Sequence, residues 1–260
     1  MSNKKSNATR RAENLAASER AAAIRKEQER KERRRRTVVI TAVIGVVLAV
    51  ILAAGYAVQS ARDTTGQAST PPSGVVDKYA VPRGEDSAPV TVTVYEDFMC
   101  PFCGDFESES RPVLKKYVDN GDVQVQYRVL SFLDRASSGT EYSTRAMSAL
   151  GVVLDTSGAE VAGKFHDLLY ENQPAEGSSG LSDDRLIDLA VQAGANKDDV
   201  SGPIRSVRFE QWVKNATDDA SKKQVNSTPT VLVDGTKLEF STIPELLDKM
   251  TAAIDAGIQG

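Results

Sequence analysis

Two stretches of the chain alternate apolar and polar side chains with the period of a β-strand. Residues 89–95 read PVTVTVY, and residues 123–129 read VQVQYRV. Such alternation of β-branched and aromatic residues predicts strands. Between them, residues 101–120 place apolar side chains at helical spacing and end at an Asn-Gly pair, which is typical of a helix end. A strand, a helix and a second strand in this order predict a parallel pair.

The next stretch, about residues 138–220, shows no strand alternation and predicts a helical insertion. Ser138 and Glu141 have capping-box spacing near its start, and a helix capped by Ser182 is expected to end at Gly194. Strand patterns return only after the insertion. They predict a short strand at 230–233, a hairpin turn at 234–235, a return strand at 238–240 and a closing helix over 242–257.

An uncharged run of 22 residues, 37–58, precedes all of these elements. As a helix it would be about 33 Å long, enough to cross the hydrocarbon core of a bilayer. Residues 1–36 carry 13 Lys or Arg against five Glu, a net charge of +8. Because positively charged flanks stay in the cytoplasm, we expect a single transmembrane helix with a cytoplasmic N-terminus and an extracytoplasmic body. A signal peptide cleaved near residues 53–55 is the alternative.

The segments on either side of the predicted span have different compositions. Residues 59–76 are rich in Ser, Thr, Gly and Ala, lack periodicity and predict a flexible linker. Residues 77–260 are long enough for one domain with its own hydrophobic core. The basic segment 1–36 contains no aromatic residue, so contact with anionic membrane lipid is favoured and nucleic-acid binding is not expected.

Cys100 and Cys103 are the only cysteines in the 260 residues, and they stand where the first predicted strand ends and the helix begins. At a helix N-terminus the first sulfur lies near unpaired N–H groups and the positive end of the helix dipole, which favours a thiolate on Cys100. A thiolate attacks disulfides, and a cysteine three residues later can resolve the mixed disulfide. The spacing therefore predicts a pair that cycles between dithiol and disulfide.

Two other interpretations of a C-x-x-C pair are weaker in this chain. Structural zinc needs four ligands, and the chain offers no further cysteine and one histidine, His166, which we expect on the surface of an insertion helix. A structural disulfide across two residues would constrain the unfolded chain very little. We therefore expect no metal and no cofactor. Outside the membrane, such a pair suits disulfide chemistry on other proteins.

Residues 97–103 (DFMCPFC), the helical insertion and residues 227–230 (STPT) before the hairpin together resemble the DsbA-like branch of the thioredoxin superfamily. The resemblance covers about residues 80–260. It implies an α/β, thioredoxin-like fold with an inserted helical domain, here preceded by a single transmembrane helix. It also implies that Pro229 is cis and faces the cysteines, and that Thr228 and Pro229 form a platform for the substrate strand.

The resemblance assigns roles to the four residues of the motif. Cys100 would be the exposed nucleophile and Cys103 the buried resolving thiol. Pro101 and Phe102 would tune the stability of the thiolate. Strongly oxidising members often carry His where this chain has Phe102, which cannot donate a side-chain hydrogen bond. We therefore expect a less acidic Cys100 and a milder oxidant.

A second departure from the family concerns proton transfer to the resolving thiol. Many relatives carry a carboxylate six residues before the first cysteine, where this chain has Val94. Glu96 and Asp97 are the candidate proton relays to Cys103 by reach alone. The alternative for either residue is a solvated side chain or a local cap.

These inferences favour a membrane-anchored, extracytoplasmic thiol-disulfide oxidoreductase that introduces disulfides into exported, unfolded or cysteine-containing proteins. The resemblance implies a quinone-linked membrane partner that reoxidises the pair, and the plasma membrane of a bacterium as its location. Two alternatives stay open: a thioredoxin-like reductant of extracytoplasmic disulfides, and a non-catalytic tethered binding module. An isomerase is disfavoured, because no dimerisation segment separates the linker from Ala80, and we expect a monomer.

Overall fold

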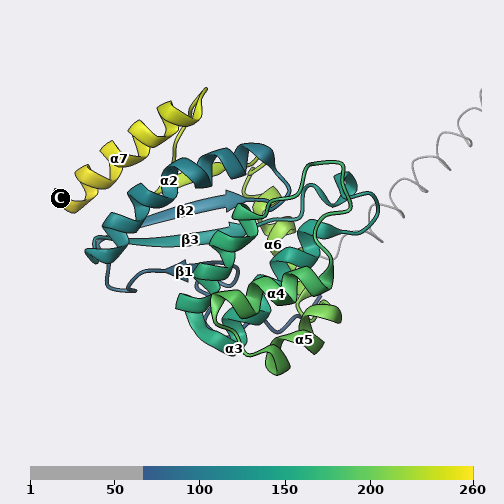
Figure 1. The fold of residues 1–260 in the computed structure, drawn as a ribbon. Helices are drawn as coiled ribbons and strands as arrows, with labels where there is room; N and C mark the ends of the chain where they lie inside the picture. Colours follow the sequence, from purple (N-terminus) through teal and green to yellow (C-terminus); the bar gives the residue numbers. More distant parts are fainter. Residues whose placement is uncertain (1–66, 260) are drawn as a thin grey trace, which may run out of the picture. The chain divides into compact units, whose positions relative to one another are not determined.

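The structure is a computed structural model that describes residues 67–259 (Figure 1). The predicted cytoplasmic segment 1–36, the predicted transmembrane helix 37–58 and the start of the predicted linker lie outside these residues. Within residues 67–259, no helix is both long enough and apolar enough to cross a bilayer. The membrane span at residues 37–58 therefore stays a prediction.

A parallel pair of strands, β2 (Val90–Glu96) and β3 (Val123–Val129), forms the centre of the sheet. This confirms the strand, helix and strand order predicted from the alternation of side chains. On the other side of β2, the antiparallel strand β4 (Thr230–Val233) is followed by a short return strand, β5 (Thr236–Lys237). The return strand was expected slightly later, at residues 238–240.

One strand gave no clear signal in the sequence. β1 (Val81–Arg83) pairs antiparallel with β3, where Val81 lies opposite Tyr127. Its central residue is Pro82, which lacks a backbone N–H and is tolerated only at the edge of a sheet. Among the described residues the strand order is β1-β3-β2-β4-β5, so β1 is such an edge.

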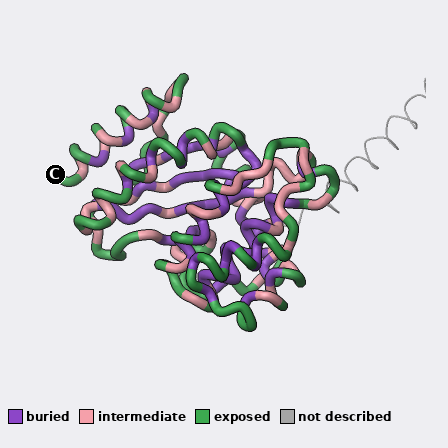
Figure 2. The backbone as a smooth tube through the Cα atoms, in the orientation of Figure 1, coloured by how far each residue is buried: buried purple, intermediate pink, exposed green. Residues whose placement is uncertain are grey.

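Helices cover both faces of the sheet. α2 (Pro101–Asp119) and α7 (Ile243–Gln259) lie on one face (Figure 1). The opposite face is covered by α6 (Glu210–Lys222), where Tyr95 of β2 and Ala220 of α6 belong to one buried cluster. Most residues of β2, β3 and β4 and the inner sides of these helices are buried (Figure 2), whereas both residues of β5 are exposed. The end of β2 from which α2 begins therefore lies between two helical layers.

The predicted insertion consists of α3 (Tyr142–Glu171), α4 (Asp183–Ala193), α5 (Lys197–Arg205) and α6. α3 is interrupted at Gly158, whose φ of 81° is left-handed and favours glycine. The second half of α3 returns toward the sheet and packs against β1 and α2. The insertion thus contacts the sheet through α3 as well as through α6.

The capping box expected at Ser138 and Glu141 is wrong. The amide of Thr144, in the first turn of α3, donates instead to Asp134 at 3.0 Å, and Asp134 belongs to the short 3-10 turn η1 (Asp134–Ala136). The hydroxyl of Ser138 donates to a loop carbonyl. Ser and Glu at capping-box spacing are also common in loops, and here the folded chain brings a better acceptor to the helix N-terminus.

Both ends expected for α4 are confirmed. The side chain of Ser182 accepts a hydrogen bond from the amide of Arg185, and Gly194 ends the helix with a φ of 116°. Each of these two helix caps involves only residues that are neighbours in the sequence. Local sequence is therefore sufficient to predict them.

Residues 67–76, the last part of the predicted linker, belong to the folded domain. Pro72 is buried, and the amide of Ser73 donates to Asp155 of α3 at 2.9 Å. The side chain of Asn215 in α6 donates to the carbonyl of Gln67 at 3.1 Å. Composition alone predicted a flexible segment here, because Ser, Thr and Pro form no periodic pattern even when they pack against a core.

Replacing Gly151 with Ala is expected to destabilise the domain by about 1–3 kcal/mol through overpacking. A Cβ at this position would lie 2.9 Å from Pro72 and 3.2 Å from the ring of Trp212. The control is Gly202→Ala in α5, where the methyl group would meet no atom within 4 Å and should raise helix propensity. Urea unfolding of both variants tests this prediction. Equal stability would show that Pro72 is not held against α3.

Candidate active site

The chain leaves β2 and enters α2 through the segment that carries the predicted redox motif. The carbonyl of Asp97 accepts the amide of Cys100 at 2.9 Å, which turns the chain out of the strand. Cys100 is the N-cap of α2 with an extended backbone (φ −78°, ψ 116°), and Pro101 follows it in the first turn of the helix. A proline costs no hydrogen bond there. The Cys100 sulfur therefore sits at a helix N-terminus.

The surroundings of the Cys100 sulfur stabilise a thiolate. The hydrogen bond from the Cys103 thiol lowers the pKa of Cys100 most, and burial opposes it. The Thr228 side chain and the amides of Cys103 and Phe102 lower the pKa further, to about 6 instead of 9.0. At neutral pH Cys100 is therefore mostly in its nucleophilic form.

Cys103 has the opposite character. It is fully buried, and burial raises its pKa well above 9.0; Cys100 and the charge of Glu96 raise it further, while the amide of Asp97 opposes them. Both cysteines are free thiols in this structure. One sulfur can thus attack a disulfide while the other keeps its proton.

The dipeptide between the cysteines faces solvent. Phe102 is 66% exposed, and Pro101 is exposed as well. The contribution of Phe102 to the acidity of Cys100 comes from its backbone amide. Its side chain is free to contact a partner protein that approaches the sulfur.

The loop before β4 reaches Cys100 from the other side. The bond between Thr228 and Pro229 is cis, as the resemblance implied, and the Thr228 carbonyl lies 3.5 Å from the Cys100 sulfur. Cys100 is only 6% exposed, less than expected for the nucleophile, because this loop lies over it. The role of Thr228 and Pro229 as a substrate platform stays a prediction.

Glu96 and His166 form a pair inside the domain. Both are fully buried, and His166 Nε2 lies 2.5 Å from Glu96 Oε1. Burial is the largest single influence and lowers the pKa of His166, but the surrounding carboxylates, with Glu96 and Asp167 foremost, together outweigh it and raise that pKa to about 10. The expectation of a surface His166 is wrong, and Glu96 is not the solvated side chain that was one alternative for it. The second half of α3 turns His166 onto the ring of Tyr127, with 3.9 Å between ring centroids.

Asp97 is also buried, but its oxygens are occupied. One accepts the Met99 amide at 2.9 Å and the Ser143 hydroxyl at 2.6 Å, and the other accepts the Leu133 amide at 2.9 Å. Burial raises the pKa of Asp97 to about 6 in spite of these hydrogen bonds. Asp97 therefore holds the turn before α2 without capping that helix, and Ser143 links the redox motif to α3.

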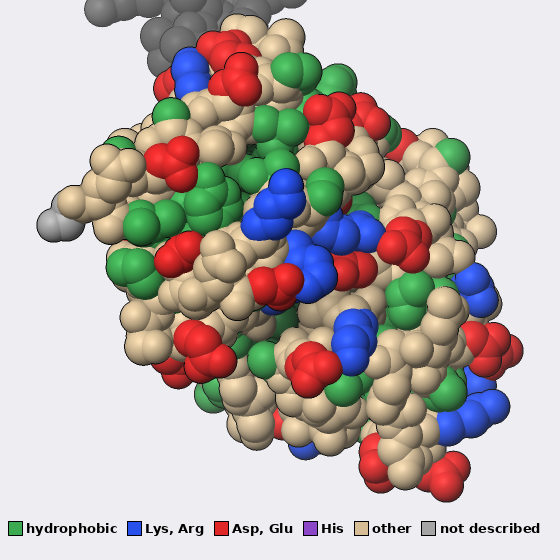
Figure 3. All heavy atoms as spheres, turned by 60° about the vertical axis from the view of Figure 1, so that its left-hand side comes forward, with side chains coloured by type: hydrophobic (Ala, Val, Ile, Leu, Met, Phe, Trp, Pro, Cys, Tyr) green, Lys and Arg blue, Asp and Glu red, His purple; other side chains and the backbone are tan. Residues whose placement is uncertain are grey.

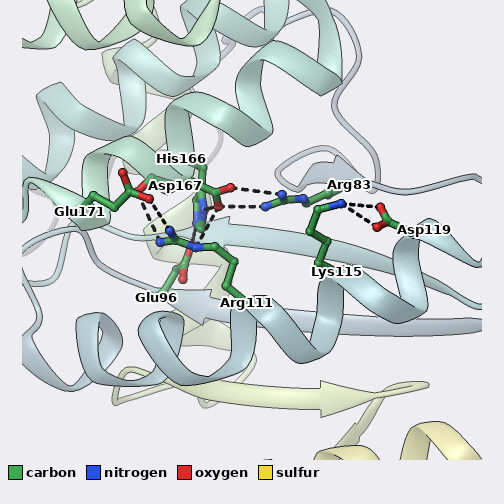
Figure 4. Close-up of polar contacts among 8 residues, drawn as sticks. All are labelled: Arg83, Glu96, Arg111, Lys115, Asp119, His166, Asp167 and Glu171. Carbon is green, nitrogen blue, oxygen red and sulfur yellow. Dashed lines mark hydrogen bonds and ion pairs between the residues drawn. The ribbon is translucent and has the colours of Figure 1, made fainter.

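An ion-pair network connects the buried His166 to the surface (Figure 4). Asp167 Oδ1 lies 3.7 Å from His166 Nδ1. The same carboxylate accepts Arg83 of β1 at 2.8 Å and pairs with Arg111 of α2 at 3.2 Å, and Arg111 also pairs with Glu171. Sequence reasoning did not find this network, because its members come from β1, β2, α2 and α3.

The outer part of the network lines a surface pocket of about 700 Å³ that includes Arg83, Arg111 and Asp167. Further basic and acidic side chains line the same pocket, among them Lys115, which bonds Asp119 at 2.6 Å. On the face shown in Figure 3, basic and acidic side chains lie next to one another. The basic groups named here are paired with carboxylates, so the pocket does not present a concentrated positive charge.

Glu107 of α2 is a further buried carboxylate beside this network. Neither of its oxygens has a hydrogen-bond partner among the described residues, and burial raises its pKa to about 8. Glu107 is therefore mostly neutral at pH 7. The remaining network then has equal numbers of acids and bases: Glu96, Asp167 and Glu171 against His166, Arg83 and Arg111.

Glu96, Glu107 and His166 are the residues that best resemble a metal site in the described part of the chain, with ligand atoms within 4.8 Å of one another. However, His166 Nε2 and Glu96 Oε1 are 2.5 Å apart. Two ligands of one tetrahedral zinc ion would be about 3.3 Å apart, given metal–ligand distances of about 2.0 Å. The contact is a hydrogen bond within an ion pair, and it leaves no room for an ion between the two atoms.

The thioredoxin family profile matches residues 77–256 of the chain. The chain belongs to the thioredoxin family. A probable disulfide bond formation protein D of Bacillus cereus is 27% identical over 172 residues, which cover 64% of this chain and 76% of the relative.

Solved structures of related proteins agree with this assignment. Reduced DsbA from Mycobacterium tuberculosis is 32% identical, with a TM-score of 0.57 over 69% of this chain and 98% of that one. Oxidised BdbD from Bacillus subtilis is 25% identical, with a TM-score of 0.62 over 74% of this chain and 98% of that one. The chain is therefore a DsbA-like member of the family.

Removing the Cys103 thiol from this DsbA-like protein is expected to raise the pKa of Cys100. Cys103→Ala deletes the hydrogen bond that lowers this pKa most, so we expect a rise of roughly one unit or more. The matched control, Cys103→Ser, keeps an O–H donor near the same position and should give a smaller rise. Ultraviolet absorbance of the thiolate against pH measures both variants. An unchanged midpoint in the Ala variant would contradict the assigned hydrogen bond.

The buried imidazolium of His166 is expected to make stability depend on pH. Its folded pKa, about 10, lies above the ordinary 6.5, so its stabilising contribution is complete below pH 6.5 and is lost as the pH rises toward 10. The difference in unfolding free energy between the oxidised wild type and His166→Gln should therefore shrink over that range. Denaturant unfolding at several pH values measures it, with Lys164→Gln on the same helix as control. A constant difference would refute an imidazolium.

Proposed function

We propose that this DsbA-like thiol-disulfide oxidoreductase is a membrane-anchored, extracytoplasmic enzyme that introduces disulfides into exported proteins through Cys100 and Cys103. The family and the disulfide bond formation relatives support oxidoreductase chemistry on cysteine-containing proteins. The proposal adds three points: the direction of electron flow, the membrane anchor and the roles of single residues. The observation that carries it is the acidic Cys100 next to a Cys103 that keeps its proton.

The acidity of Cys100 favours donation of a disulfide over reduction. The Cys100 thiolate exists only when the disulfide is reduced. Each contact that stabilises the thiolate therefore makes the disulfide easier to reduce. A pKa of about 6 lies between the values of about 7 for thioredoxin and about 3.5 for DsbA. This intermediate acidity fits the milder oxidant expected from Phe102 in place of a histidine.

The reaction proceeds in two exchange steps. A substrate thiolate attacks the Cys100 sulfur of the disulfide; the Cys100–Cys103 bond breaks, and Cys103 leaves and takes up a proton. A second substrate thiolate then attacks the substrate sulfur of the mixed disulfide, and Cys100 leaves as a thiolate. Two electrons move from the substrate dithiol to the enzyme pair. The low pKa of Cys100 makes it the better leaving group in the second step.

Glu96 is the proposed proton relay for Cys103. Its Oε2 is buried and has no hydrogen-bond partner among the described residues, while its charge acts on the Cys103 thiol. Both oxygens of Asp97 already accept hydrogen bonds, which favours Glu96 of the two candidates. His166 would hold the Glu96 carboxylate in place through Oε1 and leave Oε2 available for the proton.

The partners follow from this reaction. Thr228 and Pro229 would bind an extended segment of an exported, cysteine-containing protein beside the exposed side chain of Phe102. A quinone-linked membrane protein would reoxidise the pair, and residues 37–58 would hold the enzyme in the bacterial plasma membrane, where residues 1–36 contact lipid. The names of the curated relatives, which describe disulfide bond formation, support the oxidising direction.

The reduction potential of the full chain tests the direction of electron flow. Equilibration in glutathione buffers, followed by thiol alkylation and mass measurement, gives the fraction oxidised. A potential less negative than about −180 mV supports disulfide donation. A potential near about −270 mV, as in thioredoxin, would favour the reductant instead.

Covalent trapping separates an enzyme from a binding module. Cys103→Ser cannot resolve a mixed disulfide, so this variant should accumulate disulfide-linked partners through Cys100. Cys100→Ser with Cys103 retained is the matched control, and it should trap none, because Cys103 is buried and protonated. A Cys103→Ser variant that traps no partner would favour the non-catalytic module.

A further inference from the structure

A glutamine from the helical insertion reaches the backbone of the redox motif. Gln173 follows the C-terminal end of α3, and its side-chain amide Nε2 lies 2.8 Å from the Cys100 carbonyl and 3.2 Å from the Phe98 carbonyl. Two carbonyl acceptors match the two N–H donors of one side-chain amide. The contact spans 73 residues of sequence and joins the insertion to the first turn of α2.

Gly104 leaves the space that this glutamine occupies. A Cβ on Gly104 would lie 2.2 Å from Gln173 Oε1, closer than real Cβ contacts, and 3.0 Å from Gln173 Cδ, tighter than most of them. The amide of Gln173 therefore lies against the backbone of the residue next to Cys103. Any larger residue at position 104 must displace the Gln173 amide.

The Cys100 carbonyl also belongs to the first turn of α2, so a change in its position would disturb that turn. It also accepts the amides of Cys103 at 3.0 Å and Gly104 at 3.2 Å, which are the first hydrogen bonds of α2. The groups that lower the pKa of Cys100 include the Cys103 thiol and the amides of Cys103 and Phe102, all in this same turn. Of these groups, the Cys103 amide is bonded to the Cys100 carbonyl, so a displaced carbonyl would change the direction of this N–H relative to the sulfur.

We infer that Gln173 is a positioning residue that sets the acidity of Cys100 by holding the Cys100 carbonyl, and that Gly104 is required to admit it. The inference rests on the redox role of Cys100 proposed above, but not on the direction of electron flow. Gln173 touches neither sulfur. It acts through the backbone, and the insertion thereby takes part in tuning the redox pair.

Three variants test the inference: Gln173→Ala, Gly104→Ala and the double variant. Gln173→Ala removes the donors, and Gly104→Ala keeps them but forces the amide away. Each should raise the midpoint of thiolate absorbance by on the order of one pKa unit, a tenfold change in the thiolate-to-thiol ratio. The double variant should shift no further than Gln173→Ala alone, because both changes remove the same contact.

Stability separates this role from a merely structural one. Ala at position 104 replaces a glycine in a helix, which by itself stabilises the helix. Gly104→Ala should therefore raise the pKa of Cys100 while lowering the unfolding free energy little. The matched control is Asn172→Ala, which removes the neighbouring side chain that bonds Leu168 and Arg185 and should leave the midpoint unchanged.

The outcomes distinguish the two proposals. If the wild-type Cys100 titrates near 9.0, the acidic nucleophile of the proposed function fails. If the wild type titrates near 6 and Gln173→Ala does too, only the positioning role of Gln173 is refuted. Additive shifts in the double variant would also refute it, because Gly104 and Gln173 would then act separately.

Discussion

The hydrogen bond from the Cys103 thiol to the Cys100 sulfur is the contact on which the active site depends. It exists only if one sulfur lies at the N-terminus of α2 and the other is buried behind it with its proton. β2 brings the motif to the end of the sheet, Pro101 allows the helix to begin at once, and the loop at Pro229 covers the first sulfur. Each of these features serves the same separation of charge between two chemically identical groups.

A protein that buries ionisable groups near such a pair must compensate for their desolvation. Here Glu96 is paired with His166, and the pair continues through Asp167 to Arg83 and Arg111 at the surface. The exception is Glu107, which avoids a buried charge because it keeps its proton near neutral pH. The result is a neutral network below the redox helix, within which a carboxylate can lie close to Cys103 without being an isolated charge.

The helical insertion is part of the active site and not only an addition to the fold. Its first helix supplies Ser143 to Asp97 and His166 to Glu96, and Gln173 follows the same helix to reach Cys100. These contacts approach the redox helix and the end of β2 from the insertion. A small movement of α3 would therefore change the hydrogen bonds around the redox pair, since its contacts there are direct.

The sequence by itself determined those features whose physical cause is local: the alternation in β2 and β3, the caps of α4, and the placement of Cys100 at a helix start. It also identified the family, because the motif and the segment at Pro229 are short and specific. Only the tertiary structure decided the environment of His166, Glu96, Glu107 and Gln173. Burial, pairing and the resulting pKa values depend on which side chains arrive from distant parts of the chain, and no local period carries that information.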